Sequence, residues 1–393
     1  MSPDLEGLPG MEATVLAEQA LLGALLLRPR HLPAIADWLE AGHFYLPHHA
    51  ALYVAMRRLA DDGHAVLTDG YSSDQGLDWL TRTTAVAMRE APGLTPSHAH
   101  TLVSICPQPD NAAAYARMVL AGHSRRTIAE HAKRLAHAAR PTKDPALQGE
   151  AVSAQADALA DVLAVLSRHW RTHPGTGPRG SPSPPPSGSA PSDQQHADEQ
   201  AFLSAATTRP VELKDIRSYL TAEDFADPLH QQLYRCLTAL HHRGEPIDPV
   251  TVVWEAQHRG ILAHTSPETV LTTCAHSGND PAYWATRILD HSLISAATTT
   301  AQHIELAAAD PATTPHRLIA VSRHALGNLT TVRLRWHHAH HHGPPTPPRP
   351  ARPPARGSAT QPPPRTTRGI RPGSNSSTPP VPASGSALAT HSR

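Results

Sequence analysis

Apolar residues recur along much of the chain at spacings of three and four, the period of an amphipathic helix. Leu32, Ile35 and Leu39 form one such stripe, and a second runs over residues 52–59. The alternation of apolar and polar residues that marks a strand is nearly absent, and there is no Asn-Gly turn of the kind that closes a β-hairpin. The pattern therefore predicts an all-α protein.

The helical pattern occurs twice. The segment 18–63 aligns with the segment 199–244 without a gap, and roughly 18 of about 46 positions are identical, several times the chance level for ordinary composition. The identical pairs include Glu18 with Glu199, Phe44 with Phe225, His49 with His230, Tyr53 with Tyr234 and Gly63 with Gly244. The chain therefore contains two copies of one helical unit.

Each copy continues into two long, Ala-rich helical patterns. They cover residues 111–139 and 145–170 after the first unit, and residues 281–309 and 311–336 after the second. Arg140-Pro141-Thr142 and Asp310-Pro311 interrupt these patterns and are typical of the tips of helical hairpins. We therefore expect each copy to be a small helical globule followed by a helical hairpin.

Proline is too abundant for one compact fold, with 40 residues in 393. The predicted organisation has five parts, with the Pro-rich linker and tail expected to be disordered. They are a flexible N-terminus (1–11), a first helical domain (12–170), a Pro/Gly/Ser-rich linker (171–196), a second helical domain (197–336) and a His/Pro/Arg-rich basic tail (337–393).

Several short motifs of the repeat point to a known family. The first copy reads Glu18-Gln19-Ala20 before a Leu-rich helix, then Phe44-Tyr45 and Leu52-Tyr53; the second reads Glu199-Gln200-Ala201, Leu233-Tyr234 and Gly244-Glu245-Pro246-Ile247-Asp248. On these residues the unit resembles the N-terminal domain of DnaB-type replicative helicases. The first copy departs from the family pattern after Gly63, where His64-Ala65-Val66 replaces Pro-Ile-Asp.

The resemblance implies a non-catalytic, all-α module. In that family the hairpins pair between subunits, and the domains build a collar that binds primase and loaders. This chain would then carry two docking modules for a replicative helicase, primase or helicase loader. Self-association through the hairpins is one expectation, and pairing of the two hairpins inside one chain, as a pseudo-two-fold monomer, is the other.

No motor chemistry is expected. A phosphate loop needs a Gly-Lys-Ser/Thr sequence, and none of the three lysines, Lys133, Lys143 and Lys214, follows a glycine. We therefore predict no enzyme activity, no catalytic residues and no cofactor. A helicase remnant that has lost its motor is the alternative within the same family.

Candidate metal ligands are weak in the sequence. The histidine-rich run at 337–342 could bind a transition metal, but a low-complexity polar tract is favoured. Glu18 and Glu199 are expected to act structurally, near the positive end of the helix that each begins. His49 and His230 are expected to pack or cap rather than ligate, so no metal site is predicted.

Charge adds a second hypothesis. Formal net charge is zero, but no Asp or Glu follows Asp310, which leaves a basic tail. The candidate interaction residues are Arg117, Arg125, Arg126, Lys133 and Arg134 on one long helix, and Arg349, Arg352 and Arg356 in the tail. A solvated helix face is the default for the first group, with a nucleic-acid or partner contact as the alternative. The tail could bind DNA without sequence preference through phosphates, as a DNA-binding accessory protein would.

The remaining signals concern the compartment. Three cysteines without a CxxC pair argue against a secreted disulfide framework, and the expectation is buried free thiols. The apolar run at 21–27 is too short to span a bilayer and lacks the basic residues that precede the apolar core of a signal peptide. The sequence therefore predicts a cytoplasmic protein with no membrane contact.

Overall fold

A computed structural model describes residues 11–67, 72–142, 145–170, 192–275 and 280–341. Every regular element in these ranges is a helix, which confirms the all-α prediction. The predicted disorder of the linker at 171–191 and of the tail at 342–393 concerns residues outside the described ranges. None of the described helices combines the length and the apolarity needed to cross a bilayer.

The first copy begins with a five-helix globule that leads into a hairpin. The globule helices are α1 (Met11–Leu27), α2 (Leu32–Ala36), α3 (Pro47–Asp61), α4 (Ser73–Glu90) and α5 (Pro96–Ile105), and the hairpin helices are α6 (Ala112–Ala138) and α7 (Pro145–His169). The globule core contains the stripe of Leu32, Ile35 and Leu39, all fully or almost fully buried. The apolar periodicity therefore identified the buried face correctly.

The second copy repeats this order. Its globule contains α8 (Asp193–Thr208), α9 (Leu213–Ile216), α10 (Pro228–Arg243), α11 (Pro249–His258) and α12 (Pro267–Cys274), and its hairpin contains α13 (Pro281–Ala309) and α14 (Pro315–His341). Helix α8 begins inside the range expected as linker, and α14 runs five residues past Trp336, into the range expected as tail.

The two globules repeat individual contacts as well as the helix order. The Tyr53 hydroxyl donates to the Leu39 carbonyl at 3.0 Å, and the Tyr234 hydroxyl donates to the Leu220 carbonyl at the same distance. Burial raises the pKa of Tyr53 to about 12. Gly63 and Gly244 follow α3 and α10 with φ of 73° and 68°, the left-handed conformation that lets a chain leave a helix.

The cysteines are free thiols. Cys236 and Cys274 are buried, and burial raises their pKa values to about 11 and about 12. Cys106 is only partly buried, and burial raises its pKa as well. The expectation of buried thiols therefore holds for the second copy and only in part for the first.

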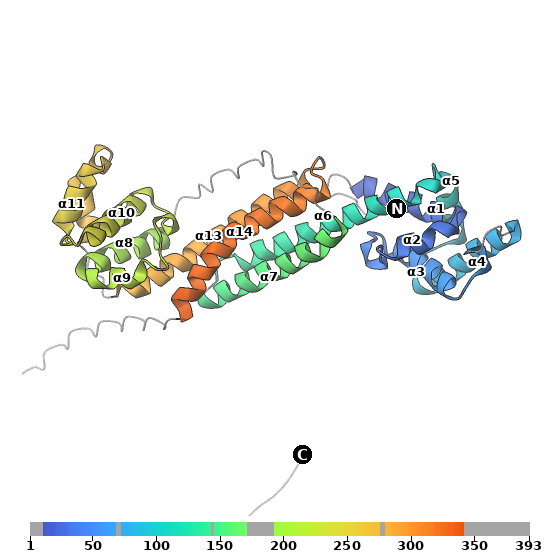
Figure 1. The fold of residues 1–393 in the computed structure, drawn as a ribbon, viewed down its shortest axis with the longest axis horizontal. Helices are drawn as coiled ribbons and strands as arrows, with labels where there is room; N and C mark the ends of the chain where they lie inside the picture. Colours follow the sequence, from blue (N-terminus) through green and yellow to red (C-terminus); the bar gives the residue numbers. More distant parts are fainter. Residues whose placement is uncertain (1–10, 68–71, 143–144, 171–191, 276–279, 342–393) are drawn as a thin grey trace, which may run out of the picture. The chain divides into compact units, whose positions relative to one another are not determined.

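The two hairpins pack against each other, as Figure 1 shows for the four long helices α6, α7, α13 and α14. One apolar cluster joins them, with Ile128 and Leu159 from the first hairpin and Leu293, Ile304 and Leu329 from the second. A hairpin of two helices cannot enclose a core by itself, whereas four helices can. Of the two arrangements left open by the sequence, the structure has the pairing inside one chain.

A close approach fixes the register of the two hairpins. Gly149 on α7 faces Trp336 on α14, and a Cβ placed on Gly149 would lie within 3.0 Å of three atoms of the indole ring. Trp336 is almost fully buried and donates from Nε1 to Asp290 on α13 at 2.7 Å. The ring therefore has little room to move away.

Gly149→Ala should destabilise the protein by about 1–3 kcal/mol, because the added methyl group overpacks the seam against the Trp336 ring. Gly327→Ala is the matched control, since Gly327 lies on helix α14 with open space around its Cβ position. The control should gain up to about 1 kcal/mol from helix propensity. Urea denaturation of both variants gives the comparison, and equal stabilities would refute the packing of these hairpins.

Candidate functional site: polar anchors and exposed surfaces

Each globule contains a buried glutamate that caps a helix of the same globule. Glu18 on α1 accepts the backbone N–H groups of Tyr45 and Leu46, at the start of α3. Glu199 on α8 accepts those of Ala226 and Asp227, at 2.8 and 3.3 Å, at the start of α10. Both carboxylates are fully buried. Their charge is stabilised by these N–H groups, which belong to the two residues before each helix, and by the positive end of that helix.

A histidine completes each of these arrangements. Nδ1 of His49 lies 2.9 Å from Oε2 of Glu18, and Nδ1 of His230 lies 2.9 Å from Oε2 of Glu199. Glu18 and Glu199 do lie near a positive helix end, but this end belongs to α3 and α10, so the expectation that each stabilises the helix it begins was wrong. Each acts on the helix packed against its own, because a residue in the middle of α1 or α8 is already beyond the first turn.

Arg125, one of the predicted interaction residues, binds inside the chain. Its guanidinium donates to the carbonyls of Ala308, Asp310 and Thr313 at 2.6–2.7 Å. These carbonyls lie at the C-terminal end of α13 and in the following turn, and α13 has no basic residue of its own in its last turn. Arg125 therefore supplies the positive charge that favours the negative end of this helix.

Two more arginines attach the hairpins to the loops before α3 and α10. Arg126 on α6 donates to the His43 carbonyl at 2.9 Å and lies over the Tyr45 ring. Arg335 on α14 donates to Asp224 at 3.0 Å and to the Tyr219 carbonyl at 3.1 Å. Arg335 is not recognisable as a functional residue in the sequence, because nothing near it in the chain indicates its buried partner Asp224.

The other predicted residues on α6 are more exposed. Lys133 and Arg134 line a groove of about 470 Å³ between α6 and α7, together with Ala151 and Gln155. Arg134 pairs with Glu130 one turn before it, at 3.0 Å, and Arg117 is exposed. The tail residues Arg349, Arg352 and Arg356 lie outside the described residues. The proposed interaction roles of all eight residues remain predictions.

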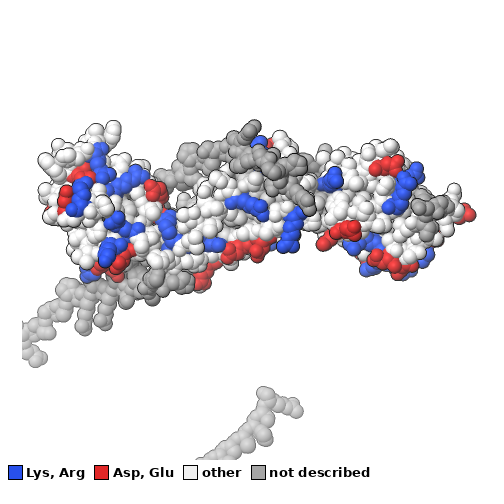
Figure 2. Space-filling view, viewed as in Figure 1, with Lys and Arg blue, Asp and Glu red and all other residues white. Residues whose placement is uncertain are grey.

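Charged side chains of both signs are scattered over the face drawn in Figure 2, most of which is uncharged. Basic and acidic side chains alternate over the globules and the hairpins in this view, and no continuous basic stripe crosses the described atoms. A groove that tracks a nucleic-acid backbone needs a continuous positive surface. This face therefore gives no separate support to nucleic-acid binding by the described part of the chain.

Helix α11 of the second globule carries an exposed apolar surface. The side chains of Trp254 and Val250 are 64% and 70% exposed and lie one turn apart. The His258 ring packs beside the Trp254 ring at 4.8 Å between centroids. We call Val250, Trp254 and His258 the α11 surface. Large aromatic side chains of this kind contribute most to affinity where two proteins meet.

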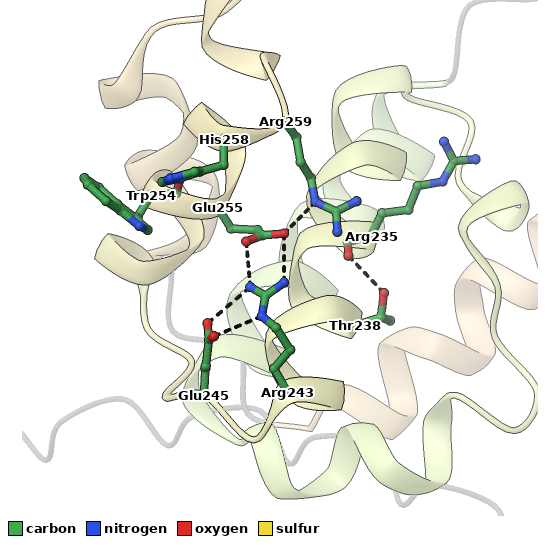
Figure 3. A network of polar contacts seen from close by, with 8 residues as sticks. All are labelled: Arg235, Thr238, Arg243, Glu245, Trp254, Glu255, His258 and Arg259. Carbon is green, nitrogen blue, oxygen red and sulfur yellow. Dashed lines mark hydrogen bonds and ion pairs between the residues drawn. The ribbon is translucent and has the colours of Figure 1, made fainter.

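A network of ion pairs holds α11 against α10 (Figure 3). Glu255 accepts from Arg243 at 2.6 Å and from Arg259 at 2.7 Å, and Arg243 also binds Glu245. The Arg243 guanidinium holds the pKa of Glu255 below its usual value, against the opposing effect of burial. In Figure 3 the Trp254 ring points away from this network. The network fixes the helix and leaves the ring available.

The helix that follows α3 in the first globule is different. Its tryptophan, Trp79 on α4, is fully buried and donates from Nε1 to the Leu25 carbonyl at 3.3 Å. The two copies thus use the tryptophan of the fourth globule helix in opposite ways. Only the second globule presents this aromatic side chain to solvent.

Comparison with known proteins agrees with the internal repeat. Residues 11–70 and 191–287 match the model of the DnaB-like helicase N-terminal domain. Two segments of the chain thus resemble the DnaB-like helicase N-terminal domain. The matched residues take in α1–α3 of the first globule and the whole second globule, and they stop soon after α13 begins.

The chain also resembles curated proteins. The chain is 33% identical over 118 residues to the replicative DNA helicase DnaB of Mycobacterium leprae (strain TN), and 35% identical over 111 residues to the replicative DNA helicase DnaC of Bacillus subtilis (strain 168). The matches cover 28% and 26% of this chain, and 19% and 24% of those proteins. No solved structure matches the chain significantly.

Arg125→Ala should lower stability by about 2 kcal/mol, because the three carbonyls lose their charged donor. Hydrogen exchange should rise in the turn at 309–314 before it rises elsewhere. Arg117→Ala, an exposed position on the same helix, is the control and should change neither quantity. Unchanged exchange in the Arg125 variant would mean that the α13 end does not depend on this side chain.

Proposed function

We propose that this protein is a non-catalytic accessory factor of DNA replication, which docks on a replicative helicase, primase or helicase loader through its DnaB-like domains. The observation that carries the proposal is the pairing of both hairpins inside one chain. Hairpin faces buried in this way cannot pair with those of another subunit. The globule surfaces are then what the protein offers to a partner.

The names of the similar proteins indicate the process in which we propose that this chain takes part. Both curated relatives are named replicative DNA helicases. The matches cover only 19% and 24% of those proteins, and the 393 residues of this chain contain no Gly-Lys-Ser/Thr phosphate-loop motif. A protein that shares a domain with the helicase can bind the partners of that domain without driving unwinding itself.

Two linked domains add to the docking argument. If both domains bind one oligomeric partner, binding of the first domain holds the second close to its site. The second contact then forms at a high effective concentration. The α11 surface is the part of the second globule best suited to a protein contact, because Trp254 combines a large apolar area with high exposure. We place the main docking contact there.

Trp254→Ala should weaken binding to that partner at least about 30-fold, the factor that corresponds to about 2 kcal/mol for an interface tryptophan. The measurement is biolayer interferometry of the full chain against immobilised helicase, primase and loader of the same organism. Val211→Ala is the control, because Val211 is 84% exposed and belongs to the short helix Pro210–Glu212 and not to α11. Equal weakening by both variants would argue against the α11 surface. If the unaltered chain bound none of the three proteins, the proposed function itself would be wrong.

The basic tail supports a second candidate function, non-specific DNA binding. This candidate function is supported by the composition of the tail. Arginines such as Arg349, Arg352 and Arg356 follow Asp310, and no acidic residue lies among them. Phosphate contacts of this kind release counterions and make affinity fall steeply with salt. The tail would hold the protein near DNA while a globule binds the partner.

Deletion of residues 342–393 should abolish DNA binding and leave partner binding intact. Fluorescence anisotropy with a labelled duplex, at several salt concentrations, measures the first quantity. The full chain should lose affinity by about a factor of ten or more between 50 and 200 mM salt. A full chain without salt-dependent affinity would exclude the DNA-binding function and leave the docking proposal untouched.

A further inference from the structure

Three histidines of the first globule meet at the start of α3 and α5. His48 and His49 occupy the first turn of α3, and His98 occupies the first turn of α5. One ring nitrogen of each lies within 4.8 Å of those of the other two. The ring centroids of His48 and His98 are 5.1 Å apart, and those of His49 and His98 are 5.5 Å apart.

The hydrogen bond to Glu18 determines which nitrogen of His49 is available. Glu18 already accepts two backbone N–H groups, so it acts as a carboxylate and Nδ1 of His49 donates its hydrogen to it. In a neutral imidazole, Nε2 then carries a lone pair. This Nε2 atom is buried and has no hydrogen-bond partner among the described protein atoms, in a side chain with no exposed area.

A second unpartnered nitrogen belongs to the same cluster. Nε2 of His98 is also buried and has no hydrogen-bond partner in the part of the chain that the structure describes. Buried polar atoms of side chains are nearly always satisfied, and two unsatisfied imidazole nitrogens in one cluster call for a shared explanation. Burial lowers the pKa values of His48 and His98, which favours the neutral rings that metal binding needs.

We propose that His48, His49 and His98 form a binding site for a divalent transition-metal ion of the zinc type. Imidazole is a preferred ligand for this class of ion, and three histidines with water as the fourth ligand make a tetrahedral site. Glu18 would be a positioning residue, since a carboxylate on the far nitrogen of a metal-bound histidine fixes the tautomer and the ring orientation.

The spacing of the ligand atoms suits such a site after small movements. Tetrahedral zinc with bonds of about 2.1 Å needs nitrogen atoms about 3.4 Å apart. The cluster is somewhat wider, with separations of up to 4.8 Å. His48 and His98 are only partly buried, so their rings can turn inward, while Glu18 holds His49 in place. Metal binding would thereby link α3 to α5.

The second copy has an equivalent cluster, but none of its ring nitrogens is buried without a hydrogen-bond partner among the described residues. His230 and Glu199 repeat the buried pair, but their neighbours are Asp227 and His196. Asp227 caps α10 by accepting from Leu229 and His230, and it also pairs with His196 at 3.1 Å. Among the described residues, no side-chain atom of this cluster is both buried and without a hydrogen-bond partner. We therefore assign the metal site to the first copy alone.

Titration of the metal-free full chain with Zn²⁺ tests the site. We expect one tight site by calorimetry, and an increase in Tm of several degrees at saturating Zn²⁺, because the ion binds the folded state. Co²⁺ as a probe should give the intense visible absorption of four-coordinate cobalt. His98→Ala should weaken the tight site at least about 10-fold and remove this absorption, and His48→Ala should do the same.

His100→Ala is the matched control, because His100 is an exposed histidine on the same helix α5. It should bind Zn²⁺ as the unaltered chain does, and so should His196→Ala in the second copy. Circular dichroism of each metal-free variant checks that it folds. Tight binding that survives in His98→Ala and in His48→Ala, as it would if the histidines at 337–342 held the ion, overturns the proposal. So does a cobalt spectrum of the weak, six-coordinate type.

Discussion

The arrangement of this protein depends on the burial of the apolar faces of four long helices. Neither hairpin can enclose its own stripe of Ala, Leu and Ile, since two helices leave one side of the seam open to water. Ile128 and Leu159 from one hairpin and Leu293 and Leu329 from the other are buried in a single cluster. Once this cluster forms, the end of one hairpin lies beside polar groups of the other. Arg125 then reaches the carbonyls at the end of α13, and Gly149 meets Trp336.

Duplication in one chain changes what such a hairpin can do. A single-copy protein must find its second hairpin on another molecule, at a cost in translational and rotational freedom. Here both hairpins belong to one polypeptide, so the contact forms within the chain and its stability does not depend on protein concentration. The copies have also diverged where they face outward. Trp79 is buried in α4, whereas Trp254 is exposed on α11.

The sequence predicted the helices better than it predicted which helices pack against each other. Residues 281–309 were expected as one helix and form α13, because alanine and leucine favour helix and Pro281 suits a first turn. The stripe at Leu32, Ile35 and Leu39 was correctly expected to be buried. The apolar periodicity identifies which face of a helix is buried, but it does not identify the surface against which that face packs. The choice between pairing within and between chains therefore needed the structure.

The candidate sites were harder to predict for the same reason. Glu18 and His49 are separated in sequence, and only the packing of α1 against α3 brings the carboxylate to the N–H groups of Tyr45 and Leu46. The repetition of both residues as Glu199 and His230 was a visible signal that they act together. His98 comes from α5, which lies beyond the segment 18–63 that aligns without a gap, so the repeat gave no such signal for it. A buried pair kept in both copies is explained by capping alone. A metal ion bound by the first copy would account for the two buried ring nitrogens there, of His49 and His98, that have no partner among the described residues.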